Sequence, residues 1–265
     1  MSITPPTPLA VVTGASSGIG LELARQFAEH GFDLVVAAED AELTQAARQL
    51  ERLGTHVESV RVDLASADGV EELARFVLAR PRAVDALALN AGIGAGGKFA
   101  SETELDQELR LIDLNVRSTV HLAKRILPGM VERGEGRVLI TSSIASTAPG
   151  AHHAVYNASK SFTQSFAEAI REELKDTGVT VTSLMPGPTD TEFFERADLE
   201  DATMAAKRDP ADKVARQGFE AMMKGEEKVV AGSLVNKVQA KAGALVPDSL
   251  KAKVHGKLTQ KDGEH

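Results

Sequence analysis

The sequence predicts an α/β protein whose doubly wound parallel sheet carries helices on both faces. From residue 9 onward, short runs that are apolar throughout alternate with segments of helical periodicity. Strands that are apolar along their whole length are typical of parallel sheets buried on both faces. A glycine-rich stretch, TGASSGIG at residues 13–20, lies between the first apolar run and the first helical segment. Doubly wound folds place a tight turn at this point.

The elements follow one another in the order that such a fold requires. Helices are expected where apolar residues recur at three- and four-residue spacings among good helix formers. These helical segments are residues 18–30, 42–53, 69–79, 105–131 and 156–177. The predicted strands are residues 9–13, 34–38, 57–64, 84–89, 137–141, 179–184 and 228–231.

A single domain is expected over residues 1–265, with neither an internal repeat nor a second domain. Residues 192–227 are charged and helical in pattern, so we expect a small helical lid over the substrate before the last strand. Residues 232–265 form a lysine-rich C-terminal extension. Its amphipathic spacing allows contact with an anionic membrane surface, but the favoured interpretation is a solvated helix packed on the body or on a neighbouring subunit.

Composition excludes several classes of protein. The net charge of −8 argues against nucleic acid as a partner, and the absence of cysteine excludes disulfides and thiolate metal sites. No stretch approaches the roughly 20 apolar residues of a membrane-spanning helix, and the N-terminus shows no secretory signal. The expectation is a cytoplasmic protein.

The glycine-rich stretch predicts a nucleotide-binding turn. Glycine permits a tight turn, lets the backbone approach a pyrophosphate, and leaves the N-terminus of the next helix open to an anion. The spacing G-x-x-x-G-x-G is not specific by itself, but its position after the first strand makes it so. The residues expected to contact the nucleotide are Gly14, Ser16, Ser17, Gly18, Ile19 and Gly20.

The only tyrosine, Tyr156, is followed four positions later by Lys160. Residues four apart share one face of a helix, and an ammonium group close to a phenol lowers the pKa of that phenol. A tyrosine with a lowered pKa can exchange a proton near neutral pH, as carbonyl and alcohol chemistry requires. The pair occurs by chance in many helices, so its weight depends on the other motifs.

Six motifs occur in a fixed order along the chain. They are TGASSGIG at 13–20, NAG at 90–92, Asn115 within LNVRS, Ser143 within TSSIAS, YNASK at 156–160 and PGPTDT at 186–191. With these motifs the chain resembles the single-domain short-chain dehydrogenase/reductase family over residues 9–194. The resemblance implies a Rossmann-like fold and an NAD(P)-dependent oxidoreductase acting on CH–OH groups.

The resemblance also implies the catalytic residues. Tyr156 would give a proton to the substrate oxygen or take one from it, and Ser143 would hold that oxygen. Lys160 would depress the pKa of Tyr156 and bind the nicotinamide ribose. Asn115 would hold a water that links Lys160 to solvent. Taken alone, Asn115 is better interpreted as an amide that satisfies local backbone groups.

Further cofactor contacts follow from the same resemblance. Asp63 would accept a hydrogen bond from the adenine amino group, with Leu64 offering its backbone amide, while an N-cap of the next helix is an equal alternative for Asp63. Asn90 would contact the adenosine and brace the central sheet. The other expected contacts are Ala91, Gly92, Tyr156, Lys160, Pro186, Gly187, Thr189 and Thr191.

The end of the second strand decides between NAD and NADP. Glu39 and Asp40 follow Ala38 there, without an arginine to pair with a 2′-phosphate, and the glycine-rich stretch supplies no cation. A carboxylate accepts hydrogen bonds from ribose hydroxyls and repels a phosphate. The family's usual NAD-selecting aspartate would fall at Ala38, so Glu39 is one residue late. The sequence therefore favours NAD over NADP, with Glu39 on the ribose.

The substrate pocket is expected between residues 93–99, residues 144–153 and the lid with Phe193 and Phe194. These residues are mostly small or apolar, which favours an apolar secondary alcohol, ketone or aldehyde. His152 and His153 are interpreted as solvated loop residues. Two histidines without a carboxylate pair are poor evidence for zinc, so no metal is expected.

Two other kinds of protein remain as alternatives. A non-catalytic dinucleotide-binding scaffold or redox sensor is disfavoured by the complete set of catalytic residues, because a sensor has no need of a proton donor. An epimerase or dehydratase would carry a longer C-terminal substrate domain. The resemblance further implies a homodimer or homotetramer, with residues 105–130 and 156–177 at the interface.

Overall fold

The computed structural model describes residues 7–191 and 208–233. Seven strands in these ranges form one parallel sheet in the order β3-β2-β1-β4-β5-β6-β9. They are β1 (Leu9–Thr13), β2 (Asp33–Ala38), β3 (Val57–Arg61), β4 (Ala86–Leu89), β5 (Gly136–Thr141), β6 (Val179–Pro186) and β9 (Lys228–Ala231). The strand order reverses between β1 and β4, which defines a doubly wound, Rossmann-like sheet. The predicted fold class is confirmed.

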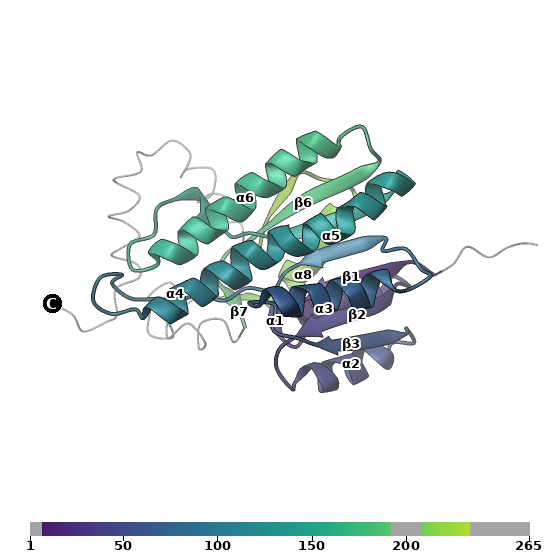
Figure 1. Ribbon diagram of the computed structural model, residues 1–265, viewed down its shortest axis with the longest axis horizontal. Helices are drawn as coiled ribbons and strands as arrows, with labels where there is room; N and C mark the ends of the chain where they lie inside the picture. The colour runs from purple at the N-terminus through teal and green to yellow at the C-terminus, as the bar shows by residue number, and fades with distance from the viewer. Residues whose placement is uncertain (1–6, 192–207, 234–265) are drawn as a thin grey trace, which may run out of the picture.

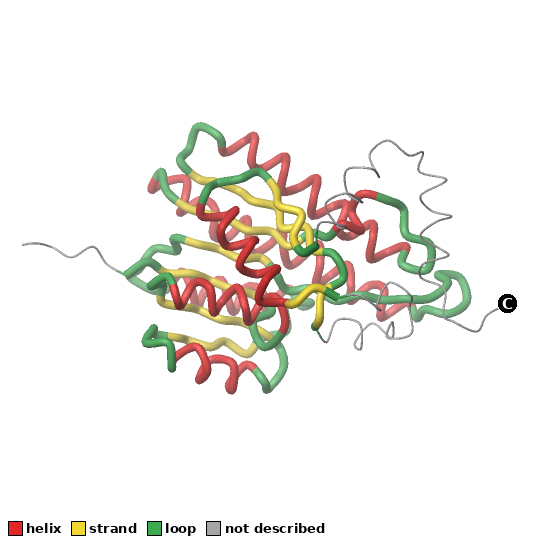
Figure 2. The backbone as a smooth tube through the Cα atoms, turned by 180° about the vertical axis from the view of Figure 1, so that it is seen from behind, coloured by secondary structure: helices red, strands yellow, loops and turns green. Residues whose placement is uncertain are grey.

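Helices cover both faces of the sheet, as Figures 1 and 2 show from opposite sides. One face carries α3 (Ala67–Leu78), α5 (Ser118–Arg133) and α6 (Ala154–Leu174), and the other carries α1 (Gly18–Glu29), α2 (Leu43–Glu51) and α8 (Ala211–Met223). A separate cluster of buried apolar side chains fills each interface between sheet and helices. The central strands β1 and β4 are therefore buried on both faces, which explains why they are apolar throughout, whereas the edge strands β3 and β9 are partly exposed and carry charged residues.

The predicted helix at residues 105–131 is interrupted. It divides into α4 (Leu105–Ile112), a π-helical segment η1 (Asp113–Arg117) and α5. Asn115 lies within the π-helical segment, and such single-turn bulges occur often at functional sites. The other predicted elements are confirmed, with ends that differ by a few residues.

The predicted lid at residues 192–227 requires a correction. Its second half contains α8, whose Val214, Phe219 and Met222 are buried against α1 and the sheet. The rings of Phe219 and Phe27 meet edge to face at 5.1 Å between centroids. Because this apolar face is buried, α8 is a core helix rather than a lid. Residues 192–207 and most of the predicted C-terminal extension lie outside the described residues.

Two short strands, one before and one after residues 192–207, pair with each other. β7 (Thr189–Asp190) pairs in parallel with β8 (Asp209–Pro210), apart from the main sheet. In the parts of the chain that the structure describes, no helix combines the length and apolar character needed to cross a membrane.

Parallel strands bring the sequence motifs to one edge of the sheet. The glycine-rich turn follows β1, Glu39 follows β2, Asp63 lies beyond β3, and Asn90 follows β4. Ser143 lies just beyond β5 and the PGPTDT motif begins at the end of β6. Ligands of doubly wound folds bind at this carboxyl edge, where the strand order reverses.

Candidate active site

Three predicted catalytic side chains meet where β5 and α6 approach each other. Ser143 precedes a short 3₁₀ segment, η2 (Ile144–Thr147), and its hydroxyl is hydrogen-bonded to the phenol of Tyr156 near the start of α6. The Ser143 hydroxyl also accepts from the Ala145 amide at 3.1 Å and lies 3.4 Å from the Pro186 carbonyl. Lys160 lies one helical turn after Tyr156, with its Nζ 5.9 Å from the tyrosine ring centroid. The predicted grouping of serine, tyrosine and lysine is therefore present.

Burial governs the pKa values of this group. It raises the pKa of Tyr156 to about 12, although the hydrogen bond with Ser143 acts in the opposite direction. Burial also lowers the pKa of Lys160 to about 8. The sequence led us to expect a depressed tyrosine pKa, and that expectation is wrong in this structure. Removal from water disfavours the phenolate more than its neighbours favour it.

Neighbouring backbone groups hold Lys160 in place. Its Nζ donates to the Thr141 carbonyl at 3.0 Å, and its side chain is 5% exposed. The Ser142 hydroxyl donates to the Lys160 carbonyl, so Ser142 points away from the Ser143 site, as expected of adjacent residues. A Cβ added to Gly92 would lie 3.3 Å from Lys160 Nζ. The absence of a side chain at Gly92 thus leaves space beside the ammonium group.

Asn115 clamps the chain beyond β4. Its Oδ1 accepts from the Ile93 amide and its Nδ2 donates to the Ile93 carbonyl, both at 2.9 Å. The Nδ2 group also donates to Ser159 on α6 at 3.1 Å. The side chain satisfies local backbone groups, as the plainer interpretation of the sequence proposed. Its role in holding a water stays a prediction.

The glycine-rich turn, or glycine cradle, has three glycines at positions where a Cβ would meet neighbouring atoms. Gly14 has a φ of +66° and Gly18 a φ of +55°, both in the left-handed region that favours glycine. A Cβ at Gly14 would lie 2.9 Å from Cα of Ala91, and one at Gly18 would lie 2.9 Å from Cγ2 of Thr191. A Cβ at Gly20 would collide with the Gly14 carbonyl at 1.9 Å. The turn is therefore tightly enclosed by the NAG and PGPTDT motifs.

Asn90 braces the sheet beneath this turn, as predicted. Its Nδ2 donates to the Thr13 carbonyl at 3.2 Å, and its Oδ1 accepts from the Thr141 hydroxyl at 3.0 Å. The Thr13 hydroxyl in turn accepts from the Asn90 and Ala91 amides. These bonds join the ends of β1, β4 and β5.

The other predicted cofactor residues surround the cradle. Ile19 is partly buried at the start of α1, and Leu64 is buried in the core. The Thr189 hydroxyl donates to the Gly187 carbonyl at 2.9 Å, which folds the loop after β6. Ser17 is the N-cap of α1, and Ser16 donates to Asp40 at 2.9 Å. Asp40 therefore braces the turn.

An arginine that belongs to no sequence motif lies beside Glu39 and Asp63, where the adenosine is expected. Arg110 of α4 forms two parallel hydrogen bonds with Asp63, at 3.0 and 3.2 Å, and pairs with Glu39 as well. Partial burial opposes the lowering of the pKa of Asp63, but bonds from Arg110 and the Ala65 amide hold that pKa below its usual value. The two carboxylates expected on the adenosine thus share one guanidinium group.

The alternative role of Asp63 as a helix N-cap is wrong. Ser66 caps α3 and accepts from the Gly69 amide at 3.0 Å. Asp63 instead accepts from the Ala65 amide in a local turn. Its carboxylate therefore faces Arg110 rather than the helix terminus.

Two residues near Tyr156 shape the expected substrate loop. Asn157, an unassigned member of the YNASK motif, donates to the carbonyls of Ala145 and Ala148 at 3.1 and 3.0 Å. His153 is 5% exposed, and its ring centroid lies 6.5 Å from that of Tyr156. The interpretation of His153 as a solvated loop residue is therefore wrong, because His153 is packed against the start of α6.

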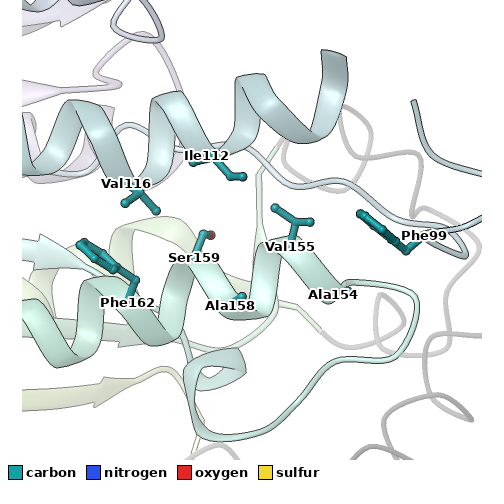
Figure 3. Close-up of a pocket in the computed structure, with 8 residues that line it drawn as sticks. All are labelled: Phe99, Ile112, Val116, Ala154, Val155, Ala158, Ser159 and Phe162. Carbon is teal, nitrogen blue, oxygen red and sulfur yellow. The ribbon is translucent and has the colours of Figure 1, made fainter. Parts of the chain in front are cut away.

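An outer groove lies between α4, η1 and α6, on the face of the molecule away from the sheet. It encloses about 440 Å³. Figure 3 shows Ile112 and Val116 on one wall, facing Val155 and Phe162 of α6. Phe99, expected in the substrate pocket, borders this groove and is 63% exposed.

The donor sets fit a dinucleotide. The glycine cradle lies at the N-terminus of α1, and a helix N-terminus suits an anion such as a pyrophosphate. Carboxylates lie at the end of β2 and beyond β3, and Ser143, the partner of Tyr156 on α6, lies just beyond β5. Among the described residues, no cluster of three or more His, Asp or Glu side chains could hold a metal ion.

Comparison with known proteins defines the family. The family model for short chain dehydrogenases matches residues 8–202, so the chain belongs to the short-chain dehydrogenase/reductase family. It is 32% identical over 179 residues to an NADP-dependent 3-hydroxy acid dehydrogenase of Salmonella typhi, covering 68% of this chain and 71% of that protein. It is 37% identical over 192 residues to 1-deoxy-11-beta-hydroxypentalenate dehydrogenase of Streptomyces exfoliatus, covering 71% and 70%.

Solved structures agree with this assignment. A short-chain dehydrogenase from Sphingobium yanoikuyae in complex with NADPH superimposes with a TM-score of 0.80 at 28% identity, covering 89% of this chain and 93% of that one. The observed fold, the family model and the solved structure therefore all indicate a nicotinamide-dependent oxidoreductase of this family.

Proposed function

We propose that this protein is an oxidoreductase that transfers a hydride between NAD(H) and an apolar secondary alcohol, ketone or aldehyde. The observation that carries the proposal is the grouping of Tyr156, Ser143 and Lys160 at the carboxyl edge that holds the glycine cradle. A scaffold or redox sensor would need the cradle but not a half-buried tyrosine beside a hydroxyl and an ammonium group.

A reduced nicotinamide bound at this site would supply the hydride for the carbonyl carbon in the reductive direction. Ser143 donates a hydrogen bond that holds the carbonyl oxygen, and Tyr156 gives its phenolic proton to that oxygen as negative charge develops there. The ammonium group of Lys160 stabilises the phenolate left behind. Oxidation of the alcohol reverses each of these proton movements.

The pKa of Tyr156, raised by burial to about 12, supports proton donation at neutral pH. A phenol with this pKa remains protonated well above neutrality, so the acid needed for reduction is always present. Oxidation requires the phenolate and becomes easier as the pH rises. Near pH 7 Tyr156 is therefore in the protonated form that donates in reduction.

The preference for NAD rests on Glu39. It follows β2, nineteen residues after the last glycine of the cradle, where an acidic residue accepts from the ribose 2′-hydroxyl in dinucleotide-binding folds. Two relatives are described with NADP or NADPH, so the other cofactor is the competing possibility. Glu39 would repel the 2′-phosphate that NADP carries.

Apolar substrates are proposed because the loops beside Tyr156 carry mainly small and apolar residues. The Gly97 amide donates to the His152 carbonyl at 2.8 Å, which joins the loop after β4 to the loop before α6. Together these loops border the space in front of the tyrosine.

A cofactor and substrate screen tests the proposal. Ketones, aldehydes and secondary alcohols are offered with NADH or NAD, and with NADPH or NADP in parallel. We expect turnover of a narrow apolar group with NADH. A tenfold or greater preference for NADPH in kcat/KM would contradict the NAD assignment, and binding of dinucleotide without turnover of any compound would favour the scaffold alternative.

We also propose that the outer groove pairs with a second copy of the chain. Leu105, Leu109 and Ile112 recur along one face of α4 and are 69%, 48% and 40% exposed, and Phe162 of α6 is 43% exposed. Exposed apolar surface that is continuous over two helices is typical of subunit interfaces, and antiparallel copies would present the same residues to each other.

Replacing Phe162 with glutamate is expected to break this assembly, because a charge would be buried in an apolar interface. The molar mass in solution, measured by light scattering after gel filtration, should fall from a multiple of 28.1 kDa toward the monomer. Leu78→Glu is the matched control, since Leu78 is 48% exposed at the end of α3, outside the groove. An unchanged mass for Phe162→Glu would exclude the groove as the interface.

A further inference from the structure

We propose that Arg110 determines how the protein distinguishes the 2′-hydroxyl of NAD from the 2′-phosphate of NADP, with Glu39 occupying a guanidinium donor that the phosphate would otherwise use. This inference rests on the proposed function, since it concerns the adenosine end of the same dinucleotide site. It adds a residue of α4 to a specificity otherwise assigned to the end of β2.

The fold places Arg110 of α4 beside two carboxylates that are distant in the sequence, where the adenosine of a dinucleotide is expected. Its side chain forms the paired hydrogen bonds with Asp63 beyond β3 and contacts Glu39 after β2 through the same Nη2 atom. Glu39 is 71 positions away in the sequence and Asp63 is 47. Both carboxylates are at the strand ends that border the nucleotide cradle.

The pairing with Asp63 fixes the position of the guanidinium group. Two parallel bonds hold its plane, and a planar fork of this kind binds phosphate as well as carboxylate. The remaining partner, Glu39, occupies donor capacity that a 2′-phosphate would otherwise use. Arg110 is therefore in place for a phosphate but is engaged by Glu39.

The ion pair between Arg110 and Glu39 is exposed to solvent, so a ligand could replace Glu39 in it. The side chains of Arg110, Glu39 and Asp63 are 41%, 46% and 42% exposed. Ion pairs between such exposed groups are weak and are screened by salt. A ligand phosphate could compete for Arg110 if Glu39 did not repel it.

Two other charged side chains, Asp40 and Arg61, lie close to Glu39. Asp40 accepts from Ser16 in the glycine-rich turn, and the Nε of Arg61 donates to the backbone carbonyl of Glu39 at 2.9 Å. Among the described residues, Arg61 is the only arginine besides Arg110 that is hydrogen-bonded to Glu39, so it is the competing candidate for a phosphate. A double substitution separates the two arginines.

The experiment measures binding of NADH and NADPH by their fluorescence, which the tryptophan-free chain does not obscure. In Glu39→Gln we expect the ratio of NADPH to NADH affinity to rise at least tenfold, because Arg110 is released to the 2′-phosphate. In Glu39→Gln with Arg110→Gln the gain should disappear. Glu71→Gln is the matched control, since Glu71 pairs with Arg125 and His121 on another surface, and its ratio should not change.

Each other outcome overturns the inference. A gain that survives in the double variant would assign the phosphate to Arg61 or to the loss of repulsion alone. An unchanged ratio in Glu39→Gln, with both cofactors bound, would remove Arg110 from specificity but leave the proposed function intact. Failure of the unsubstituted protein to bind either cofactor would reject the proposed function itself.

Discussion

Replacing Tyr156 with phenylalanine is expected to reduce kcat by about 10²–10⁴-fold, the usual contribution of a positioned acid or base, while dinucleotide affinity stays the same. Phenylalanine keeps the ring that packs beside His153 and removes only the hydroxyl that Ser143 contacts. Steady-state turnover of the best substrate from the screen, with NADH titrations in parallel, separates catalysis from binding. A kcat within a few fold of the unsubstituted protein would reject the acid–base role.

The same variant permits a direct test of the tyrosine pKa. Tyr156 is the only tyrosine and the chain has no tryptophan, so the ultraviolet absorbance of the phenolate reports one group, with Tyr156→Phe as the blank. Burial raises the pKa of Tyr156 to about 12, so no phenolate should form below pH 10 in the folded protein. Phenolate that forms below about pH 9 would show that Lys160 dominates, as the sequence alone suggested.

The sequence predicts the sheet well because burial on both faces leaves a continuous apolar run. β1, which is buried along its whole length, has the predicted ends for this reason. The site motifs were also predictable, since each follows a strand and parallel strands end at one edge. Proximity in the site thus follows from the fold class together with the position of each motif.

Other features depend on contacts that no local pattern contains. Arg110 belongs to no motif, and only the folded chain brings it to Glu39 and Asp63. In the sequence, charged residues such as Lys213 and Arg216 alternate with the apolar residues of α8. For this reason the segment was interpreted as part of a lid rather than as a core helix. The direction of the tyrosine pKa requires the burial of the side chain, which spacing to Lys160 does not reveal.

The second large effect concerns Lys160, whose replacement by methionine is expected to abolish most turnover yet stabilise the fold at pH 7. Lys160 is 5% exposed, and burial lowers its pKa from 10.5 to about 8. At pH 7 it is therefore charged in a site that disfavours charge. The difference between these pKa values corresponds to on the order of 3 kcal/mol, and the lost bond to Thr141 would offset about 1 kcal/mol of the gain.

The direction in which the stability difference changes with pH shows whether the buried charge of Lys160 causes it. Because the folded-state pKa of Lys160 is lowered, the unfolded chain binds this proton more tightly, and the penalty is complete below about pH 8. It fades as the pH rises toward 10.5. The raised pKa of Tyr156 acts in the opposite sense only above pH 10, so the window between pH 8 and 10 isolates the lysine.

Thermal or urea unfolding of both proteins across this window provides the measurement. Lys160→Met should be more stable at pH 7, by several degrees at roughly 2–4 °C per kcal/mol, and the two proteins should converge by pH 10. Lys228→Met is the matched control, because pairing with Glu168 raises the pKa of Lys228 and its loss should give no gain. A Lys160→Met protein that is less stable at every pH would show that the bond to Thr141 outweighs the buried charge. Stabilisation with loss of turnover would instead mean that the buried ammonium is retained for catalysis at a cost to stability.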